Sequence, residues 1–375
     1  MIVGVLKEPI EEHRVSLLPE AVSTLTKKNI QVLVQADAGN DAFATNANYE
    51  MAGANITDAN DISTHSDIVL SIHPPQSSLT EKLSSKILIG IYQPLYHPQL
   101  MQQWAAQNIT TFSLDMLPRT TRAQSMDVLS SQANISGYKA VIEAAHIYSR
   151  YLPMFMTAAG SIKPAKVLIL GAGVAGLQAI ATARRLGAVV EVFDTRPSVK
   201  EEVMSLGAKF IEVEGAADAS RAGGYAVEQT EAYKQQQQQK IADSIAKADI
   251  VITTAQIQGK KAPILITEPM LATMRNGSVI MDIAAATGGN TPFTKNGETV
   301  VYNGVTIVGN SNLPSTMPSD ASKLYGKNVL NFLQLITTKE GDIHLNWDDD
   351  LVKGCCITHN GQIVHERMPP TPKGE

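Results

Sequence analysis

The chain has 375 residues, a length that suits two domains of ordinary size. Hydrophobic residues make up 44% of the sequence and charged residues 18%, which is the balance of a globular protein with a substantial core. The formal net charge is -5 and no basic block interrupts the chain, so we expect no nucleic-acid partner.

The ends of the sequence bear on its compartment. The first twenty residues lack the basic start and apolar stretch of a signal peptide, and no window reaches the roughly 18 apolar residues of a membrane span. Cys355 and Cys356 are the only cysteines, and they are adjacent with no His/Cys cluster around them. We therefore expect no metal site and a soluble chain in the reducing cytoplasm.

In the first half, short apolar runs alternate with helical stretches. We expect strands at 2–6, 31–35, 67–72, 87–92 and 110–114, and helices at 19–28, 49–53, 80–84 and 98–107. Strict alternation of this kind predicts parallel strands joined by right-handed crossovers. A long helical run at 127–151 follows, and we interpret it as the connector between two domains.

A second alternating series has strands at 166–170, 189–194, 209–213, 249–254, 278–283 and 305–309. Six strands with helices between them are the number expected for a dinucleotide-binding sheet. The helical run at 321–338 and the remaining tail are expected to pack on the first domain. The fold class is therefore α/β, with two Rossmann-like domains whose parallel sheets are flanked by helices.

A glycine-rich turn lies between the first strand and the first helix of the second series. Gly171 permits a tight turn, Gly173 lets the backbone approach a pyrophosphate, and Gly176 allows the helix to press on the strand. The helix N-terminus then offers N–H groups and a positive dipole end to the phosphates. Val174 and Ala175, which begin that helix, are expected to contact the cofactor too.

The next strand ends in a carboxylate. Asp194 lies 18 residues after Gly176 (194 − 176), close to the spacing of about 20 that such folds use to place an acid on the adenosine ribose. An aspartate there repels a 2′-phosphate, which favours NAD(H) over NADP(H), although Arg196 could bind such a phosphate. We expect Asp194, Thr195 and Arg196 to contact NAD(H).

These motifs place the domain boundaries. We expect a first domain of residues 1–126 and 319–375, and an NAD(H)-binding domain of residues 127–318. Residues 215–239 are long for a connection in such a sheet, and we expect a mobile loop there. The glutamine run at 235–239 within it is interpreted as a solvated helix face.

Longer motifs resemble one family along nearly the whole chain. The stretch RTTRAQSMDVLSSQ at 119–132 resembles a loop of the NAD(H)-binding component of proton-translocating nicotinamide nucleotide transhydrogenase. GAGVAGLQAIATARRLGA at 171–188, AGGY at 222–225, AATGGN at 285–290, VGNSNLP at 308–314 and CITHNGQIVH at 356–365 carry the same resemblance.

The resemblance implies roles for individual residues. Arg119, Asp127 and Ser130 would hold the nicotinamide carboxamide and its ribose, and Gln124 would reach toward NADP(H) on the partner component. Tyr138 would support that loop. The further cofactor contacts that it implies are Gly224, Tyr225, Gln256 and Asn312.

The family also implies an assembly. It consists of a homodimer that docks on an NADP(H)-binding component attached to a membrane proton channel, which would place the chain on the inner face of the membrane.

Two other interpretations stay open. The first is alanine dehydrogenase, a family that shares Arg14 but is expected to use a lysine and a histidine where this chain has His73 and Gln93. Without that pair, the proton donor and positive group needed at a substrate carbonyl are missing. The second is a non-catalytic subunit that senses NAD(H).

Overall fold

The computed structural model describes residues 1–213 and 230–368 and divides into two compact units. The first unit combines Met1–Gln132 with Pro314–Glu375, and the second is Ala133–Leu313. The expected boundaries at 126/127 and 318/319 thus differ from the observed divisions by six and five residues. Side-chain contacts explain the shift, because Gln132 binds Arg14 and the Ala321 carbonyl, and Ser315 binds the His13 N–H, all within the first unit.

The first unit is built on an eight-stranded sheet in the order β17-β16-β6-β5-β4-β1-β2-β3. Six strands are parallel, and β16 joins β6 in the antiparallel direction. The C-terminal segment therefore packs on the first domain, as expected. The strands are β1 (Ile2–Val5), β2 (Gln31–Gln35), β3 (Asn55–Thr57), β4 (Ile68–Leu70), β5 (Ile87–Gly90), β6 (Thr110–Ser113), β16 (Cys356–His359) and β17 (Gln362–Ile363).

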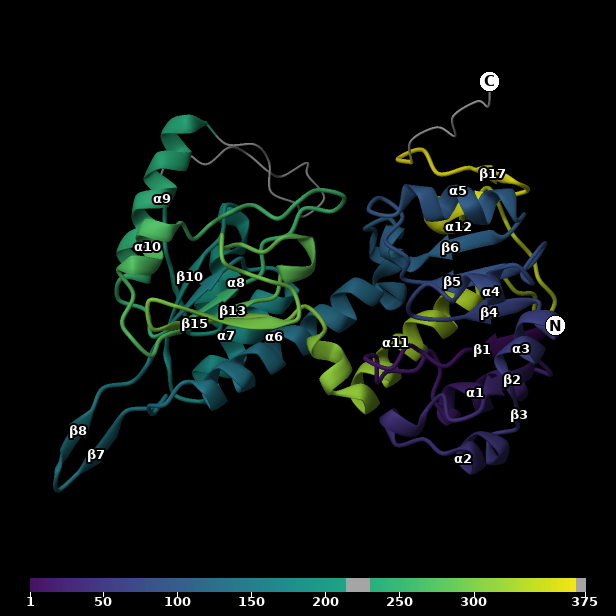
Figure 1. Cartoon of the computed structure of the whole chain (residues 1–375), viewed down its shortest axis with the longest axis horizontal. Coiled ribbons are helices and arrows are strands. Elements are labelled where there is room, and N and C mark those ends of the chain that lie inside the picture. The colour runs from purple at the N-terminus through teal and green to yellow at the C-terminus, as the bar shows by residue number, and fades with distance from the viewer. Residues whose placement is uncertain (214–229, 369–375) are drawn as a thin grey trace. The chain divides into compact units, whose positions relative to one another are not determined.

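Helices of the first unit come from both ends of the chain and share one hydrophobic core with the sheet (Figure 1). Pro19 and Pro98 occupy the first helical turn of their helices, where a missing N–H costs nothing. The helices are α1 (Pro19–Thr26), α2 (Asn46–Met51), α3 (Ala59–His65), α4 (Ser77–Thr80), α5 (Pro98–Ala106), α11 (Pro318–Leu333) and α12 (Asp350–Cys355).

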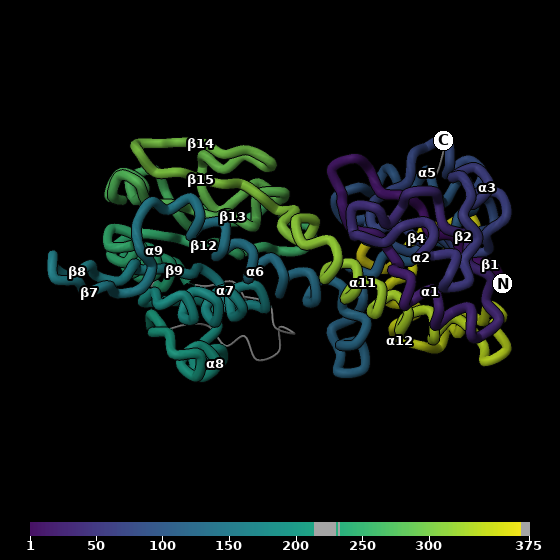
Figure 2. The backbone as a smooth tube through the Cα atoms, turned by 90° about the horizontal axis from the view of Figure 1, so that it is seen from below, coloured from purple at the N-terminus to yellow at the C-terminus, as the bar shows by residue number. Residues whose placement is uncertain are grey.

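The second unit contains a seven-stranded sheet in the order β11-β10-β9-β12-β13-β15-β14, part of which Figure 2 follows from β9 to β14. All pairs are parallel except that of β14 with β15. The strands are β9 (Lys166–Leu170), β10 (Val189–Phe193), β11 (Lys209–Phe210), β12 (Ile250–Thr253), β13 (Val279–Asp282), β14 (Glu298–Tyr302) and β15 (Val305–Gly309).

Alternate residues of these strands enter two separate cores, so both faces of the second sheet are covered. One core joins the sheet to α6 (Val128–Ile147), α7 (Val174–Arg185) and α8 (Lys200–Ser205), and the other joins it to α9 (Glu231–Ile245) and α10 (Glu268–Ala272). The parallel strand order is 3-2-1-4-5-6 in this sheet and also in the first, which is the usual doubly wound arrangement. The two Rossmann-like α/β sheets predicted from alternation are confirmed.

Three features of the second unit differ from the expectation or extend it. The β14–β15 hairpin was not expected, although Asn303 and Gly304 both have positive φ, as a type I′ turn requires. A second antiparallel hairpin, β7 (Phe155–Thr157) with β8 (Gly160–Ile162), extends away from the rest of the unit in Figure 1. Most of the loop expected at 215–239 lies outside the described residues, and its last part is helical, because α9 begins at Glu231 and carries the glutamine run on a mostly exposed helix face.

No helix in the described parts of the chain combines the length and apolarity needed to cross a bilayer.

Candidate nucleotide-binding site

The turn after β9 requires its glycines for two different reasons. Gly171 has a φ of +106°, which side chains disfavour, and its N–H donates to the Phe193 carbonyl at 2.8 Å. A Cβ on Gly176 would lie 1.9 Å from the Gly171 oxygen, so only glycine lets α7 start this close to the strand. Gly171 and Gly176 therefore shape the turn itself.

Gly173 differs from both, because a Cβ there would meet none of the described atoms within 4 Å. Its φ of −77° is one that any residue adopts, so neither backbone strain nor packing requires a glycine. The open space lies at the N-cap of α7, a 12-residue helix whose first N–H groups have no intrahelical partner. A side-chain-free approach to those N–H groups suits a phosphate, and Val174 beside it is 40% exposed.

Asp194 lies directly after β10 and is nearly buried. One carboxylate oxygen accepts the Ala172 N–H at 2.7 Å, so the acid is bonded to the glycine turn. The Arg196 guanidinium donates to both oxygens at 2.9 Å, and the Arg196 backbone N–H donates at 2.8 Å. The side-chain bonds to Asp194 raise the pKa of Arg196, and the sequence did not indicate this ion pair.

Loops after the neighbouring strands hold the turn in place. Thr254 Oγ1 donates to the Leu170 and Gly171 carbonyls at 3.3 Å. Asn290 is fully buried and exchanges hydrogen bonds with the backbone of Ala255, so the loops after β12 and β13 are joined. Sequence reasoning gave neither Thr254 nor Asn290 a role, although the AATGGN motif at 285–290 pointed to the second.

The second unit contains further residues that the sequence predicts to contact the cofactor. Gln256 is exposed and its Nε2 donates to the Ile283 carbonyl at 3.2 Å, while the Asn312 N–H donates to Asn310 Oδ1 at 2.9 Å. Thr195 is half-buried beside Asp194. Gly224 and Tyr225 lie outside the described residues.

Helix α6 packs tightly on the first turn of α7. A Cβ on Gly137 would lie 2.0 Å from the Ala175 carbonyl oxygen, so this contact admits only glycine. Tyr138, the next residue on α6, is 39% exposed.

In the first unit, a 3-10 helix (Thr121–Met126) and the start of α6 carry the other expected residues. Arg119 and Gln124 are exposed. The Asp127 carboxylate accepts the Ser130 N–H at 2.9 Å and the Ser130 hydroxyl at 2.6 Å, so the structure brings this expected pair together. The first of these bonds satisfies the Ser130 N–H at the start of α6, which gives the pair a structural role as well.

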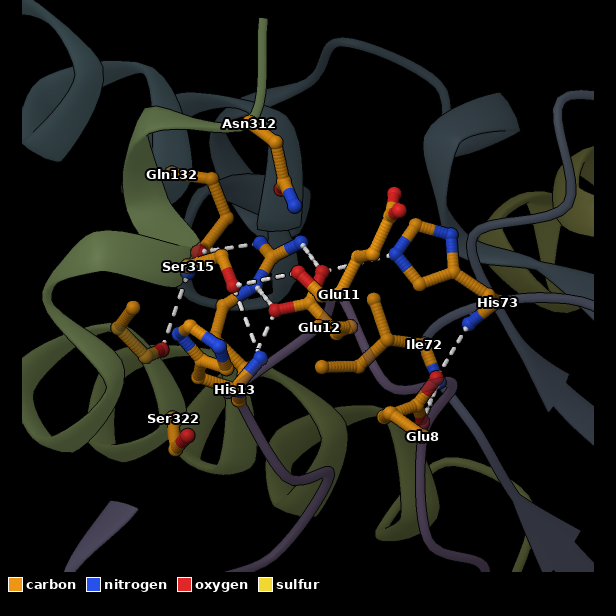
Figure 3. A network of polar contacts seen from close by, with 12 residues as sticks. Glu8, Glu11, Glu12, His13, Ile72, His73, Gln132, Asn312, Ser315 and Ser322 are labelled. Carbon is orange, nitrogen blue, oxygen red and sulfur yellow. Dashed lines mark hydrogen bonds and ion pairs between the residues drawn. The ribbon is translucent and has the colours of Figure 1, made fainter. Parts of the chain in front are cut away.

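A network of buried charges occupies the C-terminal edge of the first sheet (Figure 3). Glu12 accepts two hydrogen bonds from the Arg14 guanidinium, at 2.7 and 2.6 Å, and Gln132 Oε1 accepts a third at 2.9 Å. His73 Nε2 lies 2.8 Å from Glu12 Oε2, the oxygen that Arg14 Nη2 also binds. Although burial raises the pKa of Glu12, the bonds from Arg14 and His73 outweigh it and hold that pKa far below the ordinary value.

Glu8 lies beside this network and behaves in the opposite way. Its carboxylate accepts the N–H groups of Ile72 and His73 at 2.6 and 3.0 Å, but burial dominates and raises the pKa of Glu8 to about 7. The Arg14 guanidinium is bonded to the Glu12 carboxylate rather than to Glu8. Gln93 is exposed and has a φ of +48°.

Comparison with known proteins assigns the chain to a family. Residues 4–136 match the profile described as alanine dehydrogenase/PNT, N-terminal domain, and residues 140–366 match its C-terminal counterpart. The chain is 44% identical to an NAD(P) transhydrogenase alpha subunit of Rickettsia prowazekii, over 97% of this chain and 96% of that protein. The alpha subunit of the same name from Rhodospirillum rubrum is 43% identical, over 95% and 96% respectively.

Structural comparison agrees. The crystal structure of transhydrogenase from Sinorhizobium meliloti matches with a TM-score of 0.88 and 43% identity, over 97% of this chain and all of that one. By sequence, an alanine dehydrogenase of Staphylococcus epidermidis is less similar, with 26% identity over 99% of this chain and 96% of that protein. The chain therefore belongs to the alanine dehydrogenase/PNT family, within which it is a transhydrogenase alpha-subunit homologue.

Proposed function

We propose that this chain is the NAD(H)-binding component of a proton-translocating NAD(P) transhydrogenase, which exchanges hydride between its own NAD(H) and NADP(H) held by a partner component. The observation that carries the proposal is the open N-cap at Gly173, with Asp194 bonded to the same turn, in a chain 43–44% identical to transhydrogenase alpha subunits.

The residues of the second unit fit a dinucleotide. The turn at 171–176 leaves backbone N–H groups accessible for the pyrophosphate, and Asp194 is the acceptor for the ribose hydroxyls. Because Arg196 already occupies that carboxylate, nucleotide binding has to share or displace the guanidinium. Thr254 donates to the Gly171 carbonyl, and Asn290 bonds to the backbone of Ala255 next to Thr254, so the two residues hold the backbone of the turn in position.

For the nicotinamide end we propose the residues that the family resemblance implies. Arg119, Asp127 and Ser130 bind the carboxamide and its ribose, and the exposed Gln124 contacts the partner's nucleotide. NAD(H), when bound, supplies or accepts the hydride. Transfer between two nicotinamides releases no proton from a hydroxyl or an amine, so these side chains need only orient the ring, for which none of them has to titrate.

Two positions of the first unit favour this reaction over an amino-acid dehydrogenase. His73 and Gln93 stand where the alanine dehydrogenase family is expected to have a lysine and a histidine, and His73 is bonded to the Glu12 carboxylate at 2.8 Å. The Glu12–Arg14 pair does not distinguish the two families, because both share Arg14.

We also propose a homodimer, bound on the inner face of the membrane through the NADP(H)-binding and proton-channel subunits. All six strand residues of the β7–β8 hairpin are exposed, and Met154 and Met156 are 64% and 75% exposed. A lone two-stranded hairpin is only marginally stable in water, and its free edges suit pairing with the same hairpin of a second copy.

The decisive experiment mixes the purified chain with an NADP(H)-binding component of known competence. Reduction of an NAD analogue by NADPH is followed by absorbance, and NADH binding is measured by calorimetry. We expect transfer by the wild-type chain, and in Gln124→Ala we expect transfer reduced at least tenfold with NADH affinity changed less than twofold.

The other outcomes distinguish the alternatives. NADH oxidation by the chain alone that depends on pyruvate and ammonia would establish an alanine dehydrogenase. NADH binding without any transfer would establish a sensing subunit. If Gln124→Ala lost NADH binding instead of transfer, Gln124 would belong to the NAD(H) pocket.

A further inference from the structure

The segment that carries Gln124 is bonded to helix α11 by residues more than 200 positions away in the sequence. Within the 3-10 helix Thr121–Met126, Ala123 and Met126 are buried, whereas Gln124 and Ser125 are exposed. The buried pair packs into the first-unit core, to which α11 also contributes. The buried Ala123 and Met126 thus fix the backbone around Gln124, while Gln124 itself is exposed.

Two asparagines of α11 share a single acceptor in this segment. Nδ2 of Asn328 and Nδ2 of Asn331 each donate to the Ser125 carbonyl oxygen at 2.8 Å. The two residues are three apart and so lie on the same face of the helix. Together they use both lone pairs of one carbonyl, that of the residue next to Gln124.

The asparagine contacts extend to the start of α6. Oδ1 of Asn328 accepts the Ser131 hydroxyl at 2.7 Å, and Asn328 is only 8% exposed. Ser131 follows Ser130, whose hydroxyl is bonded to Asp127. Asn328 therefore connects the Gln124 segment to the Asp127–Ser130 pair.

A second anchor lies on the other side of Gln124. Nη1 of Arg122 donates to Asp349 Oδ2 at 2.9 Å, and Nη2 contacts Asp349 and Asp350. Asp349 also accepts the Leu351 N–H at 2.8 Å and so caps α12. Although burial opposes it, these bonds lower the pKa of Asp349, which keeps the acid charged.

We propose that Asn328 and Asn331 are positioning residues for hydride transfer: by fixing the Ser125 carbonyl, they hold the neighbouring Gln124 where the partner's nucleotide meets it. The inference rests on the proposed function, because it gives Gln124 its role at that junction. Transfer between two rings depends steeply on their alignment, and a misplacement of about 1 Å can cost on the order of a hundredfold in rate. An exposed 3-10 segment without such anchors is too short to hold its own geometry.

The test variant is Asn331→Asp, since Asn331 is half-buried and the change preserves its shape. A carboxylate has no donor, so it repels the Ser125 carbonyl instead of binding it. The matched control is Lys327→Gln, an exposed position on the same helix whose substitution changes the net charge by the same -1. Asn328→Asp is a second, buried variant, used only if it keeps the wild-type melting temperature.

With the complete chain and the NADP(H)-binding component, Asn331→Asp should lower the rate constant of transfer at least fivefold and change the NADH dissociation constant less than twofold. Lys327→Gln should leave both unchanged. As the pH is lowered and the new carboxyl gains a proton, it regains a donor, so the rate relative to wild type should recover. A purely structural defect would not produce that split or that recovery.

Equal rates in Asn331→Asp and wild type would overturn the inference, and so would a loss of NADH affinity as large as the loss of rate. If the wild-type chain transferred no hydride, the proposed function would fail, and trypsin cleavage after Arg119 and Arg122 would still test the anchoring. Faster cleavage in Asn331→Asp than in Lys327→Gln supports the anchor, whereas equal cleavage refutes it.

Discussion

The two sheets share the parallel strand order 3-2-1-4-5-6, yet their C-terminal edges are built differently. In such sheets a ligand site is expected at the point where the strand order reverses, between β1 and β4 in the first unit and between β9 and β12 in the second. The second sheet has a glycine turn there, with open space at Gly173. The first has Glu8, whose carboxylate takes the N–H groups of Ile72 and His73.

The difference shows that strand order locates a possible site, and that the loop residues decide whether it can receive a ligand. At the second sheet, backbone donors meet an unfilled space. At the first, Glu12 and Arg14 neutralise one another, and Gln132 completes the set. One fold, used twice in the same chain, thus has an open edge and a closed one.

The largest expected effect is the difference between alanine substitutions at two glycines of the open edge. Gly176→Ala places a methyl group 1.9 Å from the Gly171 carbonyl, so the turn must move, and we expect loss of measurable NADH binding with destabilisation of about 1–3 kcal/mol or more. Gly173→Ala meets no described atom and should cost at most about 1 kcal/mol, the penalty of alanine at an N-cap.

Gly173→Ala should nevertheless weaken NADH binding at least tenfold, because its methyl group enters the space that we propose for the pyrophosphate. Calorimetry and thermal melts of the two variants check the pair. If Gly173→Ala bound NADH like wild type, the open space would not be the cofactor site.

The strands and the glycine turn of the open edge could be predicted from the sequence, but the side chains that hold the turn in place could not. Apolar runs predicted the parallel strands because burial on both faces leaves few polar positions in them. The spacing from Gly176 to Asp194 predicted the acid because strand, turn and helix lengths fix it locally. Asn290 and Thr254 could not be found in this way, since their partners lie 35 and 84 residues away in the sequence.

Contacts between segments far apart in the sequence limited what else could be predicted. The antiparallel β16 pairs with β6 across more than 240 residues, and no pattern in either segment predicts this pairing. The engagement of Asp194 by Arg196 is local, but the sequence equally allowed Arg196 to face a phosphate. The β14–β15 hairpin was predictable, because Asn303-Gly304 between two strand-like runs is a strong hairpin signal.

A second prediction concerns the closed edge. Burial raises the folded-state pKa of Glu8 to about 7 from its ordinary 4.5, so the folded protein keeps a proton that the unfolded chain releases. Stability from this group is present below about pH 4.5 and is lost as the pH rises toward 7, by up to about 3 kcal/mol. Glu8→Gln should remove that loss, while the exposed Glu11→Gln should keep it.

Urea unfolding at pH 5 and pH 8 measures this difference. Both tryptophans of the chain, Trp104 and Trp347, lie in the first unit, so their fluorescence reports its unfolding. A pH dependence that is the same in Glu8→Gln and wild type would show that Glu8 stays charged in the folded state, and the closed edge would then bury a net negative charge.

The smallest expected effect concerns nucleotide preference at the open edge. Asp194→Ala removes the acceptor that we propose for the ribose hydroxyls and releases the Arg196 guanidinium, which is then available to a 2′-phosphate. Affinity for NADH should fall and that for NADPH should rise, so their ratio should shift by about tenfold, or roughly 1.4 kcal/mol. Arg196→Ala provides the matched control, since it removes the guanidinium but keeps the two backbone N–H donors of the carboxylate, and it should strengthen discrimination against NADPH. Calorimetric titration of both variants with both nucleotides decides the point, because an unchanged ratio in Asp194→Ala would mean that the carboxylate serves only to hold Ala172 and Arg196, and that specificity is set elsewhere in the unit.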